Sequence, residues 1–216
     1  MNWAYKEIEI ATIISMILKG LKELKNNNIS TKNQPENIFT LLYGIGKGSN
    51  IIIYKAIHKY TRQIFAIKII KSQNQENEFQ NKIHLMKQLF NKSEYIIKCY
   101  GSYYSIKSKN IWIVLEYYCL GSIIDFLNLM NRTYKEIKIA TIISMILKGL
   151  EELKNNNIKL KNIKSNNILI TEDGYIKLNN IYFEEIKNPI EKNINIFNVD
   201  IICLELIMGT KIENKF

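Results

Sequence analysis

The sequence predicts an α+β fold in which a sheet-rich first part is followed by helices. Between residues 39 and 70, three short segments alternate apolar and polar residues and are separated by turn residues, which is typical of strands. Other segments place apolar residues at helical spacing, which is typical of amphipathic helices. The chain has 216 residues, of which 47% are hydrophobic and 23% charged, enough for one good core or two small lobes.

The first 34 residues contain one copy of an internal repeat. Residues 5–29 read YKEIEIATIISMILKGLKELKNNNI, and residues 134–158 repeat them with only two changes, Glu9 to Lys138 and Lys22 to Glu151. Both copies are expected to form amphipathic helices. Two interpretations stay open: a recent partial duplication of a gene segment, or an extra helix that competes with or swaps for the internal copy in a homodimer.

A polar linker at residues 26–36 separates the first copy from the predicted strands. These strands are residues 39–46, 50–57, 64–70 and 111–118, and a helical stretch at Glu78–Phe90 comes before the last one. After residue 118 we expect mainly helices. They include the second copy of the repeat and a segment at Asp200–Lys211.

Charge, cysteines and hydropathy exclude several other classes of protein. The formal net charge is +10, but the lysines are spread along the chain without a basic block, so we expect no specific nucleic-acid binding. Cys99, Cys119 and Cys203 lie far apart, which favours a reducing compartment and a cytoplasmic location. The apolar stretch Ile8–Leu18 is too short to span a bilayer, so no transmembrane segment is expected.

Two short motifs at the right spacing indicate a family. Gly46-Lys47-Gly48-Ser49 lies between two predicted strands, and Ala66-Ile67-Lys68 follows on the next one, at the spacing of the lysine that pairs with nucleotide phosphates in kinases. From Pro35 to Asn180 the chain resembles the Hippo branch of the sterile-twenty-like Ser/Thr protein kinases, in stretches such as PENIFTLLYGIGKGS, WIVLEYYCLGS and IKSNNILITEDGYIKL.

The resemblance implies a bilobal protein-kinase-like fold. An antiparallel, sheet-rich N-lobe with a hinge would occupy residues 35–118, and an incomplete helical C-lobe would occupy residues 119–216, beside the separate residues 1–34. ATP would be the nucleotide. By resemblance, the residues around it are Ile45, Gly46, Gly48, Ile53, Ala66, Lys68, Glu116, Tyr118 and Leu169, with Leu115 as gatekeeper. Ordinary core packing would explain the apolar members equally well.

Several residues that carry phosphoryl transfer in the family are replaced. Asn162 aligns with the catalytic-loop aspartate, and its amide cannot usefully accept a proton. Asn180 aligns with the magnesium-binding aspartate, and its neutral carbonyl would bind Mg²⁺ more weakly. Lys82 aligns with the glutamate that should pair with Lys68. Lys164 and Asn167, a second magnesium ligand by resemblance, do match the family pattern.

These substitutions favour a pseudokinase that holds ATP without efficient transfer and acts through protein partners. A weakly active Ser/Thr kinase, which would act on a protein substrate, is the alternative that keeps Lys164 and Asn167 in use. A degenerate fragment without a stable fold is a third reading. A basic, amphipathic membrane-surface protein is a fourth, and it rests only on the first helix and the net charge.

Overall fold

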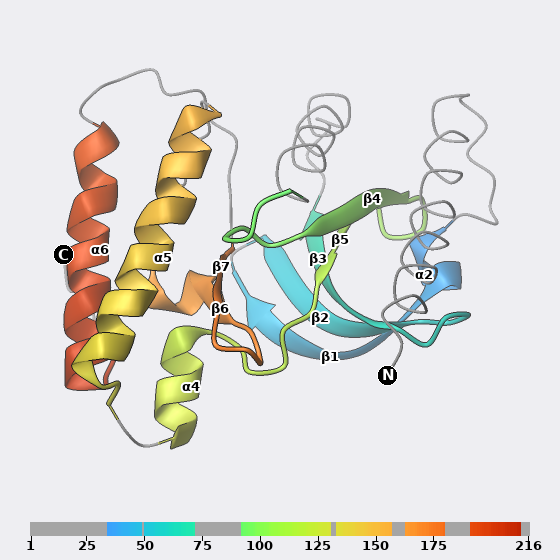
Figure 1. The fold of residues 1–216 in the computed structure, drawn as a ribbon. Coiled ribbons are helices and arrows are strands. Elements are labelled where there is room, and N and C mark those ends of the chain that lie inside the picture. Colours follow the sequence, from blue (N-terminus) through green and yellow to red (C-terminus); the bar gives the residue numbers. More distant parts are fainter. Residues whose placement is uncertain are drawn as a thin grey trace. The chain divides into compact units, whose positions relative to one another are not determined.

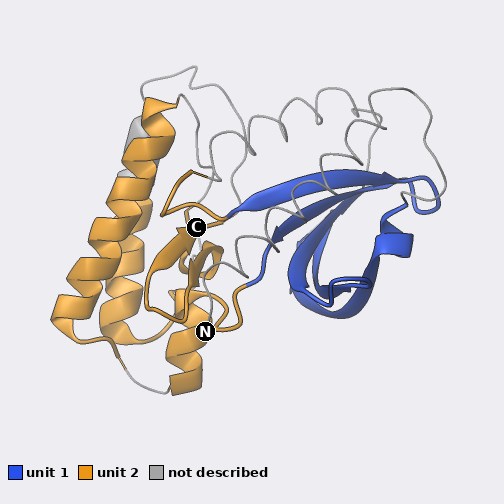
Figure 2. Ribbon diagram, turned by 45° about the vertical axis from the view of Figure 1, so that its right-hand side comes forward, with its two compact units in different colours: residues 1–87, 98–117 blue, residues 88–97, 118–216 orange. Residues whose placement is uncertain are grey.

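A computed structural model describes residues 34–48, 50–71, 92–130, 133–156, 163–179 and 191–212, with the backbone alone for residues 191–196. The chain forms two compact units, coloured separately in Figure 2. Unit 1 comprises residues 1–87 and 98–117. Unit 2 comprises residues 88–97 and 118–216, so its first segment interrupts unit 1 in the sequence.

Unit 1 is built on a five-stranded antiparallel sheet with the strand order β1-β2-β3-β5-β4 (Figure 1). The short helix α2 (Pro35–Ile38) precedes the sheet. The strands are β1 (Phe39–Lys47), β2 (Ile51–His58), β3 (Ile64–Lys71), β4 (Cys99–Ser105) and β5 (Asn110–Glu116). The four predicted strands are therefore confirmed, with ends that move by no more than two residues.

Strand β4 was not predicted, and its sequence explains why. The segment reads CYGSYYS, and its burial does not alternate, because both faces of this strand are largely covered. The register between β4 and β5 shifts between Cys99 and Gly101, and Gly101 has a φ of 157°. A β-bulge of this kind breaks the period-two pattern on which prediction depends.

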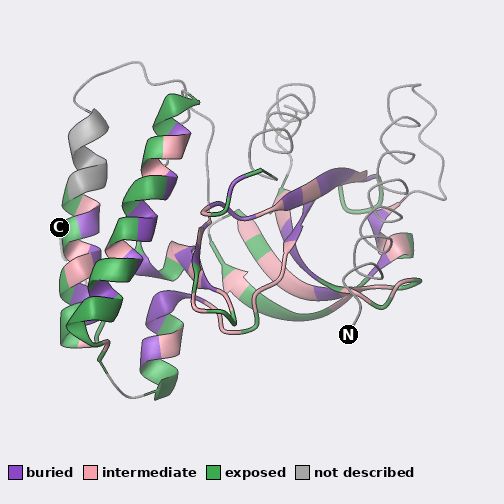
Figure 3. Cartoon of the chain, viewed as in Figure 1, coloured by how far each residue is buried: buried purple, intermediate pink, exposed green. Residues whose placement is uncertain are grey.

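The core of unit 1 lies on one face of the sheet. Because side chains of a strand alternate between faces, Phe65 and Ile67 of β3 point to the same side as Val114 of β5. Figure 3 colours the buried positions of these strands purple, and the core comprises those on this face. Its members are Phe39, Ala56, Phe65, Ile67, Tyr103, Trp112 and Val114.

The described part of unit 2 combines three helices with a small hairpin. Helix α4 spans Ile123–Met130, α5 spans Glu136–Asn155, and α6 spans Glu191–Met208. A 3₁₀ turn, η2 (Ser165–Asn167), leads into the antiparallel strands β6 (Ile168–Ile170) and β7 (Ile176–Leu178). Helix α5 packs against both α6 and β7, and α5 and α6 lie side by side in Figure 1.

Both helices of this pair were predicted, one of them with the wrong start. Helix α5 confirms the helix expected from the second repeat copy. Helix α6 begins at Glu191 rather than at Asp200 and ends before Gly209, whose φ of 70° favours glycine and stops the helix. The low apolar content of residues 191–195 hid the first turns from a periodicity search.

Two predicted helices fall outside the described residues, namely the first repeat copy within residues 1–33 and the stretch at Glu78–Phe90. Among the helices that are described, none is both long enough and apolar enough to cross a bilayer.

Candidate functional site

One face of the unit 1 sheet carries four of the residues predicted to lie around a nucleotide. Ile53 of β2 lies opposite Lys68 of β3, and Ala66 lies opposite Leu115 of β5. Because Ala66 and Lys68 are two residues apart, both side chains point away from the core side of β3. We call this set, Ile53, Ala66, Lys68 and Leu115, the Lys68 face.

Lys68 is a buried cation with apolar side chains beside it. Its side chain is 7% exposed, and Ala66 and Leu115 beside it are buried as well. Burial lowers the pKa of Lys68 to about 8, because a low-dielectric environment disfavours the charged ammonium group. An anionic group placed next to this ammonium would be attracted strongly, since the surrounding apolar side chains screen charge poorly.

The structure describes the glycine-containing turn between β1 and β2 except for Ser49, which lies outside the described residues. Gly46 lies opposite Ile53, and a Cβ at Gly46 would come within 3.4 Å of the Ile53 side chain. The Gly48 N–H donates a hydrogen bond of 2.8 Å to the Ile51 carbonyl. The turn thus brings glycine backbone close to one edge of the Lys68 face.

Two isoleucines flank this turn. Ile51 is the first residue of β2 and pairs with Ile70, so it belongs to the sheet. Ile45 of β1, one of the residues expected around ATP, is 44% exposed.

A cluster around Lys55 was missed by the sequence analysis. The Lys55 amino group lies 4.8 Å from the centre of the Tyr117 ring and 5.5 Å from that of Tyr43. Hydrogen bonding to Tyr43 raises the pKa of Lys55. Lys55 lies opposite Ala66, on the same side of the sheet as the Lys68 face. The three residues are too far apart in sequence for any local pattern to have shown their contact.

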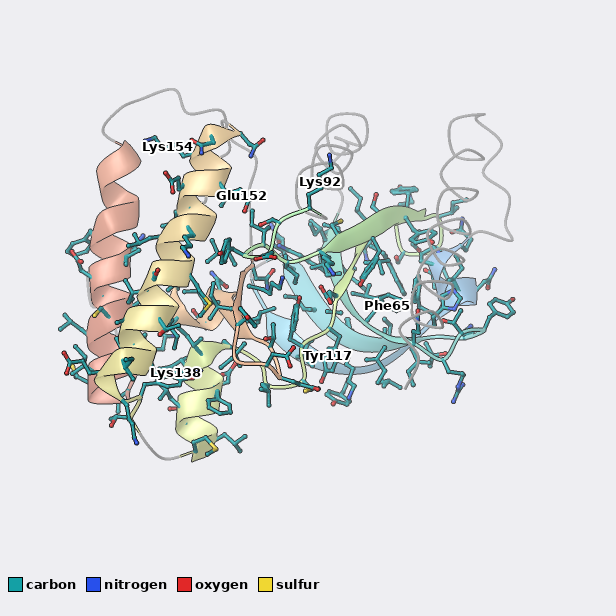
Figure 4. All side chains as sticks on the ribbon, viewed as in Figure 1. Phe65, Lys92, Tyr117, Lys138, Glu152 and Lys154 are labelled. Carbon is teal, nitrogen blue, oxygen red and sulfur yellow. The ribbon has the colours of Figure 1, made fainter. Side chains whose placement is uncertain are left out.

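The segment that follows β5 divides between the units. Glu116 is the last residue of β5, and its N–H donates a hydrogen bond of 3.1 Å to the Lys98 carbonyl. Tyr118 belongs to unit 2, where its carbonyl accepts a hydrogen bond of 3.3 Å from the Gly121 N–H. Tyr117, which lies between them in the sequence, is labelled in Figure 4.

In unit 2, the structure brings together two stretches that carry predicted catalytic residues. The Asn167 N–H donates a hydrogen bond of 2.8 Å to the Lys164 carbonyl, which closes the turn η2. The Asn179 N–H donates a hydrogen bond of 2.8 Å to the Asn167 carbonyl. Leu169 lies opposite Lys177 in the hairpin, and it also forms a bridge with Ser122.

The remaining predicted residues are not described. Asn162, Asn180 and Lys82 all lie outside the described residues. Within the described part of the chain, no three His, Cys, Asp or Glu side chains are grouped in a way that could hold a metal ion.

A comparison with protein families identifies this arrangement. The family model described as the protein kinase domain matches residues 39–181, well over half of the chain. The match runs from the first residue of β1 to just beyond the hairpin of unit 2, and so includes the Lys68 face and the turn η2. The chain belongs to the protein kinase domain family.

Proposed function

We propose that this chain is a pseudokinase related to Ser/Thr protein kinases, which binds ATP but transfers its γ-phosphoryl group inefficiently or not at all. The observation that carries the proposal is the pair of asparagines, Asn162 and Asn180, at the two positions where the family uses aspartate. We infer these positions from the resemblance to the Hippo branch.

The described residues of unit 1 fit a nucleotide. Ala66, Leu115 and Ile53 offer apolar surface to an adenine ring, and buried Lys68 supplies the positive charge that phosphates require. Gly46 and Gly48 lie at the edge of this face, and the backbone of Glu116 would meet the edge of the base. Bound ATP would supply a phosphoryl group, and this chain's residues would bind and orient it.

The missing carboxylates account for weak or absent transfer. Phosphoryl transfer depends on magnesium ligands and on a residue that orients the attacking hydroxyl group. Loss of a general base alone typically slows a reaction by about 10²- to 10⁴-fold. With Asn180 in place of a carboxylate, Asn167 would be left to hold Mg²⁺ with neutral oxygens only, which this hard cation binds weakly.

An alternative function is that of a weakly active Ser/Thr kinase. It is favoured by one specific observation: Lys164 and Asn167 are retained, and both take part in the hydrogen bonds that shape η2. A phosphorylation assay with Lys68→Ala as the control separates the two functions. Activity that this substitution abolishes would establish the weakly active kinase.

We further propose that the chain acts through protein contacts. Helix α6 exposes Leu204, Ile207 and Met208, and a groove of about 890 Å³ runs along α5 and α6. Exposed apolar side chains that cluster in this way are typical of interaction surfaces. A cytoplasmic location, and a division into residues 1–34, 35–118 and 119–216, complete the proposal. Cys99, Cys119 and Cys203 are all described by the structure and form no disulfide, which suits a reducing compartment.

Thermal unfolding with and without ATP tests nucleotide binding. At an ATP concentration of 100 times Kd, binding should stabilise the protein by about 2.7 kcal/mol. For a chain of this length the melting temperature should then rise by roughly 5–11 °C. The shift should vanish in Lys68→Ala and persist in Lys71→Ala, since Lys71 is exposed at the end of the same strand. A cooperative melt that ignores ATP would refute nucleotide binding, and a missing melt would favour a degenerate fragment.

A further inference from the structure

The repeat found in the sequence has a structural counterpart in α5. Residues 134–158 contain the whole of α5, and residues 5–29 repeat this segment 129 positions earlier with two substitutions. The structure shows which residues of α5 are buried, and therefore which parts of the repeat a second copy must retain in order to pack in the same place.

We define the seat of α5 as the surface of α6, β7 and residues 93–95 that its buried side contacts. Figure 3 shows buried and exposed positions alternating around this helix. The buried residues of α5 are Ile139, Ile142, Met145, Ile146, Gly149 and Leu153. The residues 129 positions earlier are Ile10, Ile13, Met16, Ile17, Gly20 and Leu24, identical at every one of these positions.

The most demanding position in the seat is a glycine in both copies. A Cβ at Gly149 would lie 2.7 Å from Cδ1 of Leu178 and 3.0 Å from Cβ of Tyr95. Leu178 is fully buried, so it has little room to move. Gly20 likewise lacks a Cβ, so the first copy would avoid this clash.

The polar contact of the seat is retained as well. Ser93 donates a hydrogen bond of 2.5 Å from its hydroxyl group to Oε2 of Glu152, which Figure 4 labels near one end of α5. Glu23 is the corresponding residue of the first copy. The first copy therefore carries both the apolar and the polar groups that the seat requires.

The two substitutions lie on the exposed side of α5. Lys138 and Glu151 are both exposed, so their replacement by Glu9 and Lys22 leaves the buried side unchanged. Lys138 does have a neighbour: its amino group lies 3.0 Å from where a Cβ of Gly174 would be, in the turn that contains Asp173. A glutamate at this position would bring a negative charge near that acidic turn. Repulsion between the charges would make the first copy bind the seat less tightly than α5 does.

We propose that residues 5–29 are a second occupant for the seat of α5 in the same chain. Helix α5 is joined to unit 2 on both sides, so it has the higher effective concentration at the seat and fills it in the native protein. The first copy occupies the seat when a substitution prevents α5 from packing there. The partner of this docking surface is thus a segment of the chain itself, with a buried side identical to that of α5.

Matched leucine substitutions at the two glycines test this proposal. Gly149→Leu should exclude α5 from the seat, yet the protein should keep a cooperative thermal melt, because Gly20 lets the first copy replace it. Gly20→Leu alone should melt like the unmodified protein. The double variant should lose the cooperative melt. If Gly149→Leu and the double variant melt alike, whether both fold or neither does, the proposal is overturned.

Cross-linking shows directly which segment is seated. In a Gly149→Leu chain with Cys119 and Cys203 changed to serine, a short bis-maleimide should join cysteines introduced by Ser93→Cys and Glu23→Cys. The Ser93→Cys and Glu152→Cys pair, without Gly149→Leu, is the positive control. A cross-linked product of monomer mass supports the proposal. A product only of dimer mass would mean exchange between chains, and no product would mean an empty seat; either result overturns the proposal.

Discussion

The buried ammonium group of Lys68 lowers the stability of the fold, and the proposed function uses the same group to bind phosphate. Burial holds the pKa of this lysine near 8, against an ordinary value of 10.5. Between these two pH values the unfolded chain binds more protons than the native protein does, so stability rises with pH across this window. Below pH 8 both states are protonated, and the native protein bears the full destabilising effect.

Replacing Lys68 by methionine should therefore change stability in a pH-dependent way, most favourably at neutral pH. Methionine retains much of the volume without the charge, and the lowered pKa corresponds to a gain at pH 7 of up to about 3 kcal/mol in the free energy of unfolding, measured relative to the effect of the same substitution above pH 10.5. The gain should shrink between pH 8 and pH 10.5. Chemical denaturation of both proteins across this range measures it. A gain that does not change with pH would show that the charge of Lys68 is not the cause.

The same lowered pKa predicts how ATP binding depends on pH. The ammonium form of Lys68 attracts phosphate, and below about pH 7 nearly all of the free protein carries this form. Above pH 8, affinity for ATP should fall by up to about tenfold per pH unit, because binding must then include the uptake of a proton. Isothermal titration between pH 7 and pH 9.5 would measure this decline.

Lys68→Arg is the control for this experiment, since a guanidinium group keeps its charge throughout that range. Its affinity for ATP should vary little with pH, even if it is weaker overall. A parallel decline in both proteins would assign the pH dependence to a group other than Lys68.

At the scale of elements, α4 begins with a reciprocal cap. The Asp125 N–H donates a hydrogen bond of 3.2 Å to Oγ of Ser122, and the Ser122 N–H donates one of 3.1 Å to Oδ2 of Asp125. This capping box satisfies two donors at the helix start that would otherwise lack partners. Helix α4 packs against η2 and β6, so the cap supports the part of unit 2 that carries Asn167 and Leu169.

Ser122→Ala should lower the free energy of unfolding by about 1 kcal/mol, as is usual for the loss of a serine cap. The melting temperature should fall by roughly 2–4 °C. Ser144→Ala is the matched control, because Ser144 is exposed in the middle of α5 and should change stability by less than about 0.5 kcal/mol. Equal effects of the two substitutions would contradict the role given to the cap.

Helices and strands were predicted correctly where their own apolar and polar residues follow the period of a helix or a strand, or where a repeat marks them. Strands β1, β2 and β3 alternate clearly enough to be recognised, and the repeat made α5 evident. Strand β4 escaped because it is covered on both faces, so its residues are chosen by neighbours and not by a period of two. The first turns of α6 escaped for a related reason, since they lack an apolar stripe.

In the candidate site, too, local spacing could be read from the sequence, whereas contacts between strands could not. Ala66 and Lys68 lie on one face of β3, as a spacing of two residues in a strand requires. The burial of Lys68, and with it the lowered pKa, depends on β2 and β5 on either side, which no local pattern records. The contacts of Lys55 with Tyr43 and Tyr117 likewise join three separate strands or strand ends.

At the scale of the whole molecule, each unit has its own buried core. In unit 2 the hydrogen bond between Asn179 and Asn167 joins the turn η2 to the end of the hairpin. The proposed pseudokinase would differ from an active kinase by changes of charge at two single positions, Asn162 and Asn180. Restoring those charges is therefore a test of the proposed function.

The double substitution Asn162→Asp and Asn180→Asp should raise phosphotransfer to a general protein substrate by at least about 10²-fold over the unmodified chain. The first aspartate restores a base for the attacking hydroxyl group, and the second restores a charged ligand for Mg²⁺. A radiolabelled-ATP assay would measure the transfer. Asn166→Asp is the matched control, because it adds a carboxylate to an exposed position of the same loop and should leave the rate unchanged.

The rate of the unmodified chain decides between the two proposed functions. A pseudokinase should transfer phosphate no faster than Lys68→Ala does, because neither protein completes the reaction. If the double aspartate variant gains activity from that background, the asparagines are the cause of the loss. If the unmodified chain already exceeds Lys68→Ala, and the double variant adds nothing, then Lys164 and Asn167 support transfer without carboxylates and the pseudokinase proposal is wrong.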